Sequence, residues 1–158
     1  SQKPLSIIIP MGGLGWEFAE AGFRMPKPLV NIVGRPVLLW LLDNLSFSRD
    51  DQVFLAVPAA MNKQFGLERM LAREMASLKV KVITLSFETR GWVETVLAVV
   101  RQMSAKELRQ QLVTLDCSTI YHAVDLLEKC RMLENASASV YFDIEDNWAL
   151  SATGSFKS

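Results

Sequence analysis

A glycine-rich loop follows the first apolar segment of the chain and could bind phosphate. The segment Leu5–Pro10 is continued by Met11-Gly12-Gly13-Leu14-Gly15-Trp16-Glu17. Without a Cβ at Gly12, Gly13 and Gly15, backbone N–H groups can approach a phosphate closely. The loop matches neither the dinucleotide-binding pattern GxGxxG nor the P-loop, which requires Gly-Lys-Ser/Thr. A tight strand-to-helix turn is the alternative interpretation of the same glycines.

A lysine between two prolines is a second candidate for phosphate chemistry. The sequence Pro26-Lys27-Pro28 is predicted to hold Lys27 in an extended, rigid segment, because proline fixes its own φ and restricts the residue before it. A lysine held in this way can meet a phosphate as a fixed point charge. The alternative is an ordinary solvated lysine in a loop.

Two other titratable side chains have simpler interpretations. His122 is the only histidine, and we expect it to lie at the surface or to cap a helix rather than to act as a general base. Glu94 falls at the start of a helical pattern, where the helix dipole favours a carboxylate. We therefore expect Glu94 to have a structural role.

The segments that position these residues alternate between strand-like and helix-like patterns. Short apolar runs predict buried strands at Leu5–Pro10, Gln52–Val57, Val80–Leu85, Gln111–Asp116 and Ala138–Asp143. Apolar residues at helical spacing predict helices within Arg35–Leu45, Asn62–Met75, Trp92–Met103 and Ala123–Leu133.

This alternation predicts an α/β fold of three layers, with a Rossmann-like, mostly parallel sheet and helices on both of its faces. Ligands of such sheets bind beyond the carboxyl ends of the strands, where the strand order reverses. We expect the first and fourth strands to flank that point, so that the glycine-rich loop and the segment Asp116–Ser118 meet there. The α/β domain is expected to cover residues 1–146, followed by a polar tail or short hairpin at 147–158.

Composition limits the classes of function. Seventeen basic residues balance seventeen acidic ones, so no net charge attracts nucleic acid or a membrane surface. No apolar run approaches the length of about 20 residues that a membrane span needs. Cys117 and Cys130 match neither a zinc nor a CxxC redox pattern, and we expect both to be reduced, which is typical of a cytoplasmic protein.

The ordered motifs resemble those of the sugar-phosphate nucleotidyltransferase family. The resemblance runs from Leu5 to about Asp146 and rests on the glycine-rich loop, Arg24–Val30 with its Pro-Lys-Pro, Asn31–Pro36, Thr89–Leu97 and Leu115–Tyr121. It implies a nucleotide-diphospho-sugar transferase-like fold and a reaction that joins a nucleoside triphosphate to a sugar 1-phosphate with Mg²⁺ and releases pyrophosphate. Its site residues would be Lys27 for phosphate, Gly12, Gly13, Gly15 and Gly91 for the nucleotide, and Asp116 near the metal.

The chain departs from the family pattern at ligand-contact positions. Trp16 and Glu17 replace the usual Thr and Arg, and a carboxylate at position 17 would repel the triphosphate, since two like charges ~4 Å apart cost about 4 kcal/mol at an effective dielectric of 20. Trp92 replaces a small residue near the nucleotide. Ser118 replaces the aspartate that holds Mg²⁺, and a neutral hydroxyl is a poorer ligand for this ion. Asp116 remains as a weak metal ligand. From the resemblance, we also expect the stretch that carries the family's second metal-binding aspartate to lie beyond the given sequence.

Two hypotheses about function follow, and a third possibility is that the chain is an altered version of a natural domain. The chain is either a nucleotidyltransferase-like domain with strongly impaired activity or a non-catalytic scaffold, a pseudoenzyme that binds a nucleotide, a sugar nucleotide or a protein. It is alternatively an engineered variant that forms a homo-oligomer through Trp16 and Trp92. These two indoles are expected either to fill the crevice or to stack on a ligand or partner.

Overall fold

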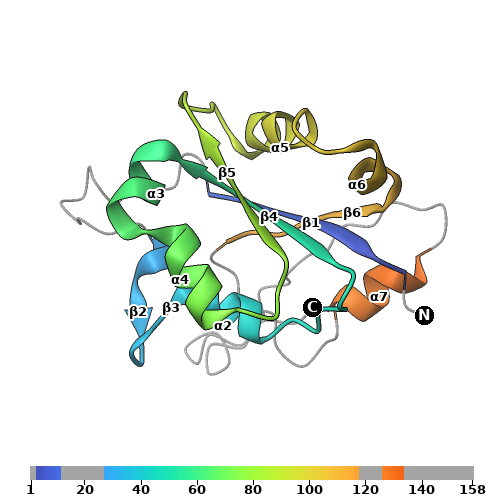
Figure 1. Ribbon diagram of the computed structural model, residues 1–158, viewed down its shortest axis with the longest axis horizontal. Coiled ribbons are helices and arrows are strands. Elements are labelled where there is room, and N and C mark those ends of the chain that lie inside the picture. The colour runs from blue at the N-terminus through green and yellow to red at the C-terminus, as the bar shows by residue number, and fades with distance from the viewer. Residues whose placement is uncertain (1–2, 12–26, 118–125, 134–158) are drawn as a thin grey trace, which may run out of the picture.

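The computed structural model describes residues 3–11, 27–117 and 126–133 (Figure 1). The strands are β1 (Leu5–Pro10), β2 (Asn31–Ile32), β3 (Arg35–Pro36), β4 (Gln52–Pro58), β5 (Val80–Leu85) and β6 (Gln111–Thr114). The helices are the short 3-10 helix η1 (Lys27–Leu29) and the α-helices α2 (Val37–Asp43), α3 (Ala59–Phe65), α4 (Leu67–Glu74), α5 (Trp92–Val100), α6 (Ala105–Arg109) and α7 (Leu126–Met132).

Four of these strands form one parallel sheet in the order β5-β4-β1-β6. Every residue of β1 is buried, and the interior of β4 is buried as well. Both strands are therefore covered on both faces, which explains why their sequences are continuously apolar rather than alternating. The outer strands β5 and β6 are partly exposed.

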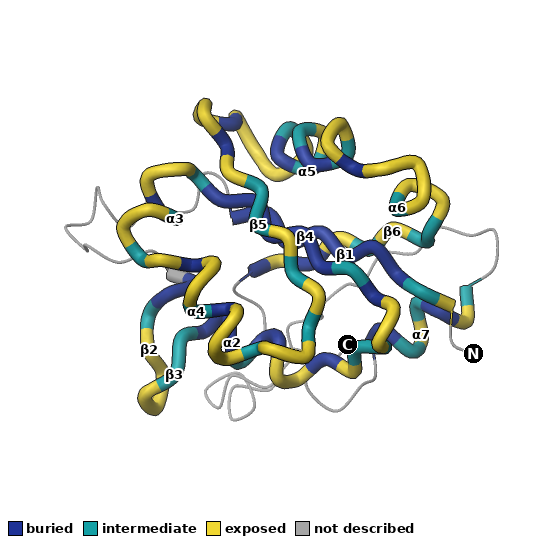
Figure 2. Tube along the Cα trace, in the orientation of Figure 1, coloured by how far each residue is buried: buried dark blue, intermediate teal, exposed yellow. Residues whose placement is uncertain are grey.

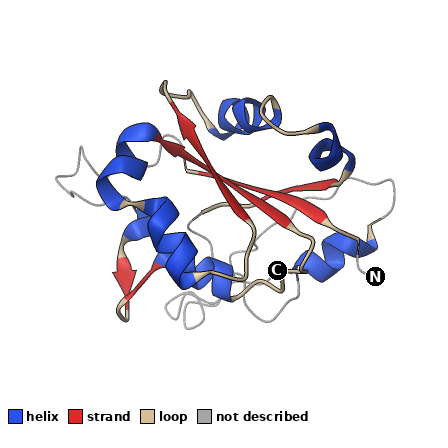
Figure 3. Cartoon of the chain, in the orientation of Figure 1, coloured by secondary structure: helices blue, strands red, loops and turns tan. Residues whose placement is uncertain are grey.

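Helices cover both faces of this sheet (Figure 3). Leu5, Ile7 and Ile9 of β1 belong to a core shared with α2, α3, α4 and α7, whereas Ile8, between them, belongs to a core shared with α5. The alternation of side chains along a strand produces this division. Figure 2 shows the buried strands between the two helical layers. The predicted three-layer α/β fold is confirmed.

The strand order reverses beside β1. From β1 the chain moves outward through β4 to β5 and then returns across the sheet to β6 on the other side of β1. The register Leu5↔Gln111 to Ile8↔Thr114 joins β1 and β6 in parallel, so their carboxyl ends lie at the same edge. The prediction that the first and fourth long strands flank the reversal point is confirmed.

Several element bounds differ from the predictions. The pattern over Asn62–Met75 is not one helix, because Gly66 adopts a left-handed conformation (φ 58°) that ends α3 before α4 begins. The predicted helix Arg35–Leu45 begins only at Val37, because Arg35 pairs with Ile32 in the β2–β3 hairpin. Two elements end before the predicted bound, β6 at Thr114 and α5 at Val100, whereas β4 extends one residue further, to Pro58.

The strand predicted at Ala138–Asp143 and the tail at 147–158 lie outside the described residues. In the part of the chain that the structure describes, no helix is long and apolar enough to cross a membrane.

A buried ion pair fixes α7 at the amino-terminal edge of the sheet. Arg131 donates from Nη1 to Asp51 Oδ1 (2.7 Å) and from Nη2 to Asp51 Oδ2 (2.5 Å). Burial alone would raise the pKa of Asp51, but the Arg131 guanidinium and the backbone N–H groups of Ser48 and Leu5 outweigh burial and hold that pKa below its ordinary value. This pair ties α7 to the start of β4 and, through Leu5, to β1.

Candidate functional site

The ends of β1 and β6 define the edge at which the predicted site residues should gather. Met11 N–H donates to Ala56 O (2.7 Å), and Leu115 N–H donates to Ile8 O (2.9 Å), so sheet hydrogen bonding continues just past both strands. The glycine-rich loop and the segment after Cys117 leave the sheet from this edge. Gly12, Gly13, Gly15, Trp16, Glu17, Ser118 and His122 themselves lie outside the described residues.

Asp116 is the predicted site residue that the structure describes beyond β6. Leu115 and Cys117 on either side of it are buried in the core, while Asp116 is exposed. The alternation of side chains thus directs the carboxylate away from the core shared with α7. Within residues 3–11, 27–117 and 126–133, no three His, Cys, Asp or Glu side chains are grouped as a metal site would require.

Lys27 begins η1, so the prediction of an extended segment is wrong for the residues that the structure describes. Proline's fixed φ of about −65° also suits a 3-10 helix. The N–H group that proline lacks would have no acceptor within the helix in the first turn, so its absence costs little there. Pro28 and Leu29 are buried, and Val37 N–H donates to Val30 O (3.0 Å). The backbone on which Lys27 is mounted is therefore fixed by packing.

The start of α5 is held by a compact set of hydrogen bonds. The hydroxyls of Thr89 and Thr95 are 2.7 Å apart and buried, and Thr95 also donates to Gly91 O (3.2 Å). Glu94 Oε2 accepts from the backbone N–H of Arg90 (2.8 Å) and from Arg90 Nε (3.3 Å). The Arg90 backbone N–H, followed by its side chain, lowers the pKa of Glu94. The prediction that Glu94 lies at the start of a helix is confirmed.

Gly91 leaves space in front of its backbone. Its φ of 172° is extended and open to any residue, and a Cβ built on it would meet no atom within 4 Å. The described fold therefore does not by itself require glycine at this position. A ligand could reach the backbone of Gly91 through this space.

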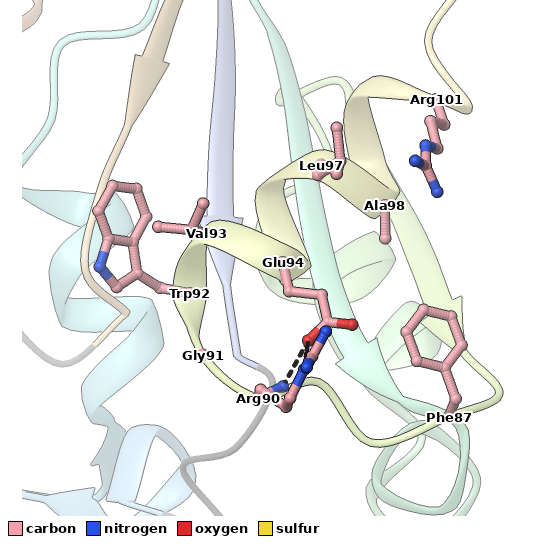
Figure 4. Close-up of a pocket in the computed structure, with 9 residues that line it drawn as sticks. All are labelled: Phe87, Arg90, Gly91, Trp92, Val93, Glu94, Leu97, Ala98 and Arg101. Carbon is pink, nitrogen blue, oxygen red and sulfur yellow. Dashed lines mark hydrogen bonds and ion pairs between the residues drawn. The ribbon is translucent and has the colours of Figure 1, made fainter.

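A groove of about 710 Å³ runs along the outer side of α5 and the loop before it (Figure 4). Its lining is mostly apolar, with Arg90 and Arg101 near its two ends; the lining residues are Phe87, Arg90, Gly91, Trp92, Val93, Glu94, Leu97, Ala98 and Arg101. Trp92 is 63% exposed, so its indole is not enclosed as a plug would be. This exposure favours the alternative in which Trp92 contacts a ligand or a partner.

Sequence reasoning missed two described features near this site. The helix α6 was not predicted, although Ser104 and Glu107 form a capping box that the pattern Ser-x-x-Glu could have revealed. The extended outer groove was also missed, because the helical period shows which residues share a face but not whether another element covers that face.

Solved structures that are similar to this chain include the following two. One is the mannosyltransferase PcManGT from Pyrobaculum calidifontis in complex with GDP-Man and Mn²⁺, at 17% identity and a TM-score of 0.53, covering 80% of this chain and 31% of that one. The other is a nucleoside-diphosphate-sugar pyrophosphorylase from Vibrio cholerae RC9, at 19% identity and a TM-score of 0.53, covering 78% of this chain and 52% of that one.

The likeness is one of fold. The chain shares the α/β fold of these two neighbours and spans about a third and about half of their respective lengths. No protein-family model matches the sequence. No curated protein matches it either.

Proposed function

We propose that this chain is a sugar-phosphate nucleotidyltransferase-like domain that binds a nucleotide at the β1–β6 edge. The observation that carries the proposal is the reversal of strand order between β1 and β6, because ligands of open parallel sheets bind at such points. The glycine-rich loop follows β1, and Asp116 follows β6. Four of the residues singled out from sequence thus come from the two segments that leave this edge: Gly12, Gly13, Gly15 and Asp116.

The proposed roles follow from chemistry and position. Gly12, Gly13 and Gly15 would present backbone N–H groups to phosphate, and Lys27 would neutralise phosphate charge from its packed 3-10 turn. Gly91 would let the nucleotide approach the start of α5, in front of which the structure leaves space.

A divalent metal fits only in part. Mg²⁺ in nucleotide sites commonly uses one or two carboxylates, phosphate oxygens and several waters. Asp116 supplies one exposed carboxylate, so it could hold an ion that also binds the phosphates of the nucleotide, and that ion would neutralise their charge. The mannosyltransferase with a similar fold was solved with Mn²⁺ and GDP-Man, which supports a divalent ion and a nucleotide sugar as the ligands to test first.

The proposed reaction joins a nucleoside triphosphate to a sugar 1-phosphate. An oxygen of the sugar phosphate attacks the α-phosphorus, the bond to the β-phosphate oxygen breaks, and pyrophosphate leaves. Such transfers depend on positioning and on charge neutralisation. Glu17 and Ser118 weaken the second requirement, so we expect strongly impaired or absent turnover in this chain.

Calorimetry with nucleoside triphosphates and nucleotide sugars, with and without Mg²⁺ or Mn²⁺, tests binding. Pyrophosphate release from nucleoside triphosphate plus sugar 1-phosphate tests turnover in the same preparations. We expect measurable binding with little or no release of pyrophosphate. Absence of binding across the panel would remove the proposed nucleotide site.

Charge reversions make this test specific to the β1–β6 edge. Glu17→Arg and Ser118→Asp should each increase the affinity for nucleotide or metal. Glu68→Arg reverses an exposed carboxylate on α4 and serves as the control for a change in net charge. Equal effects of Glu17→Arg and Glu68→Arg would show that the gain is not local, and no gain from either reversion would show that the site is misassigned.

A non-catalytic interaction scaffold is the second candidate, favoured by the exposed indole of Trp92. A chain that binds nucleotide without turnover even after both reversions would fit this alternative. Self-association through Trp16 and Trp92 and a cytoplasmic location stay predictions.

A further inference from the structure

The helix α5 is apolar on both of its sides. Thr95 and Val99 face the sheet and are buried, whereas Val93 and Leu97 on the other side are exposed, Leu97 by 47%. A helix that is apolar all round is normally covered all round. Within the described part of the chain, the sheet covers only the inner side of α5, and the outer side lines the groove of Figure 4.

Three residues of α5 and its C-cap residue Arg101 form a regular contact stripe, in which Leu97 and Arg101 are exposed and Glu94 and Ala98 are partly exposed. Glu94, Leu97, Ala98 and Arg101 occupy positions i, i+3, i+4 and i+7, which is the spacing of one helix face. The stripe has an acid at one end, a base at the other, and a large and a small apolar residue between them. When a second, antiparallel stripe is centred on the midpoint between Leu97 and Ala98, each acid therefore faces a base and each large apolar residue faces a small one.

We infer that this face binds a second copy of the same chain, with the two α5 helices packed antiparallel about a two-fold axis at that midpoint. In this arrangement Glu94 lies opposite Arg101 of the second copy, and Leu97 lies opposite Ala98 of the second copy. A two-fold axis makes every contact occur twice. The small Ala98 lets the helix axes approach while the Leu97 side chain packs over it.

The charges of the stripe are available for this pairing. Arg90 donates both of its hydrogen bonds to Oε2 of Glu94. In the described residues, no hydrogen bond is found for Glu94 Oε1, and Arg101 makes no ion pair there. Each copy would thus offer one carboxylate oxygen and one guanidinium to the other, and the antiparallel helix dipoles would add to the attraction.

The neighbouring apolar side chains extend the contact. Figure 4 shows Trp92 and Phe87 on opposite sides of the start of α5, with Val93 close to Trp92. All three side chains are exposed and apolar, so they would lie around the central stripe. The dimer axis is set by Leu97 and Ala98, and neither Trp16 nor nucleotide binding is needed. This inference is therefore independent of the proposed function.

A second copy fits better than an unrelated protein because the stripe supplies its own complement. Another acidic or basic partner would satisfy only one of the two charges, whereas the reversed stripe satisfies both. The spacing of seven residues between Glu94 and Arg101 is about 10.5 Å along a helix, which sets the same separation for the two ion pairs.

Sedimentation velocity over micromolar to millimolar protein tests the interface. The 17.7 kDa chain should show a concentration-dependent mass rising toward twice that value, and the association should weaken at high salt. Leu97→Arg should shift the chain to the monomer. The matched control is Leu108→Arg on α6, because Leu108 is 48% exposed and lies outside the stripe; it should leave the association unchanged. A monomer at every concentration would overturn the inference.

A charge exchange tests the antiparallel register. Glu94→Arg places two arginines opposite each other, and Arg101→Glu places two glutamates opposite each other, so each variant alone should be monomeric. In an equal mixture, each contact joins an arginine to a glutamate, and the heterodimer should form with an affinity within about tenfold of the original. Circular dichroism verifies that both variants are folded, because Glu94→Arg also removes the contacts with Arg90. Folded variants that fail to associate when mixed, or that dimerise alone, would overturn this register.

Discussion

Replacing Arg131 by methionine should strongly destabilise the fold, because it leaves a buried carboxylate without its cation. Asp51 is 1% exposed and Arg131 is 6% exposed. Methionine keeps most of the aliphatic volume of arginine, so the change acts mainly on charge and hydrogen bonding. Arg131→Met also removes the bonds from Nη1 to Lys3 O (2.9 Å) and from Nη2 to Ser46 O (3.3 Å).

The expected size of this effect follows from what remains around Asp51. Its two oxygens would still accept the N–H groups of Leu5 (2.9 Å) and Ser48 (2.7 Å), but they would lose both bonds to the guanidinium. Breaking a buried pair by removing one partner costs about 3–5 kcal/mol. Since a domain is stable by about 5–15 kcal/mol in total, this one change would remove a large part of the stability.

Urea denaturation at neutral pH measures the loss in the free energy of unfolding, provided that its dependence on urea concentration is the same in both proteins. The double variant Asp51→Asn with Arg131→Met removes both charges and should cost less than the two single variants added together, with a coupling of about 0.5–3 kcal/mol. A loss below about 1 kcal/mol in Arg131→Met, or strict additivity in the double variant, would contradict a stabilising contact between these two side chains.

The ion pair between Asp51 and Arg131 also predicts how the free energy of unfolding depends on pH. The folded protein holds the pKa of Asp51 below its unfolded value, so the stabilisation is complete above the unfolded pKa of about 3.9 and is lost as the pH falls through the folded pKa. The difference in stability between the original chain and Arg131→Met should therefore be constant near neutral pH and shrink in acid. A difference that grew on acidification would refute this assignment.

Three further changes test local parts of the fold. Val33 is 91% exposed and has φ 51°, a left-handed conformation that costs a β-branched residue about 1–2 kcal/mol; Val33→Asn should recover about 1 kcal/mol in thermal or urea unfolding, and Val33→Ala should recover less. Thr95→Val leaves the buried Thr89 hydroxyl without its partner, whereas Thr89→Val leaves Thr95 still donating to Gly91 O. Thr95→Val should therefore lower the free energy of unfolding by about 1–3 kcal/mol, and by more than Thr89→Val does. Equal losses in the two variants would argue against this network. Ser104→Ala removes the N-cap of α6 and should cost about 0.5–2 kcal/mol, with faster amide exchange confined to α6 and the adjacent end of α5.

The local patterns of the sequence determined the elements of the sheet. Leu5–Pro10 and Val80–Leu85 are strands with the bounds expected from their sequences. Leu5–Pro10 is buried at every position, because a strand covered on both faces needs apolar residues throughout. The order of the elements also led to the reversal point between β1 and β6. Glu94 was placed correctly at the start of a helix, since the helix dipole acts within one turn.

The tertiary structure decided what depends on residues that are distant in sequence. The helical period predicted a helix within Ala123–Leu133, but only packing places Arg131 of that helix against Asp51, 80 residues away. Gly66 divides one apolar period into two helices because its backbone takes a positive φ, which periodicity does not report. The exposure of Trp92 and Leu97 was likewise undetermined by sequence, because burial depends on which elements pack over a face and not on the side chains that form it.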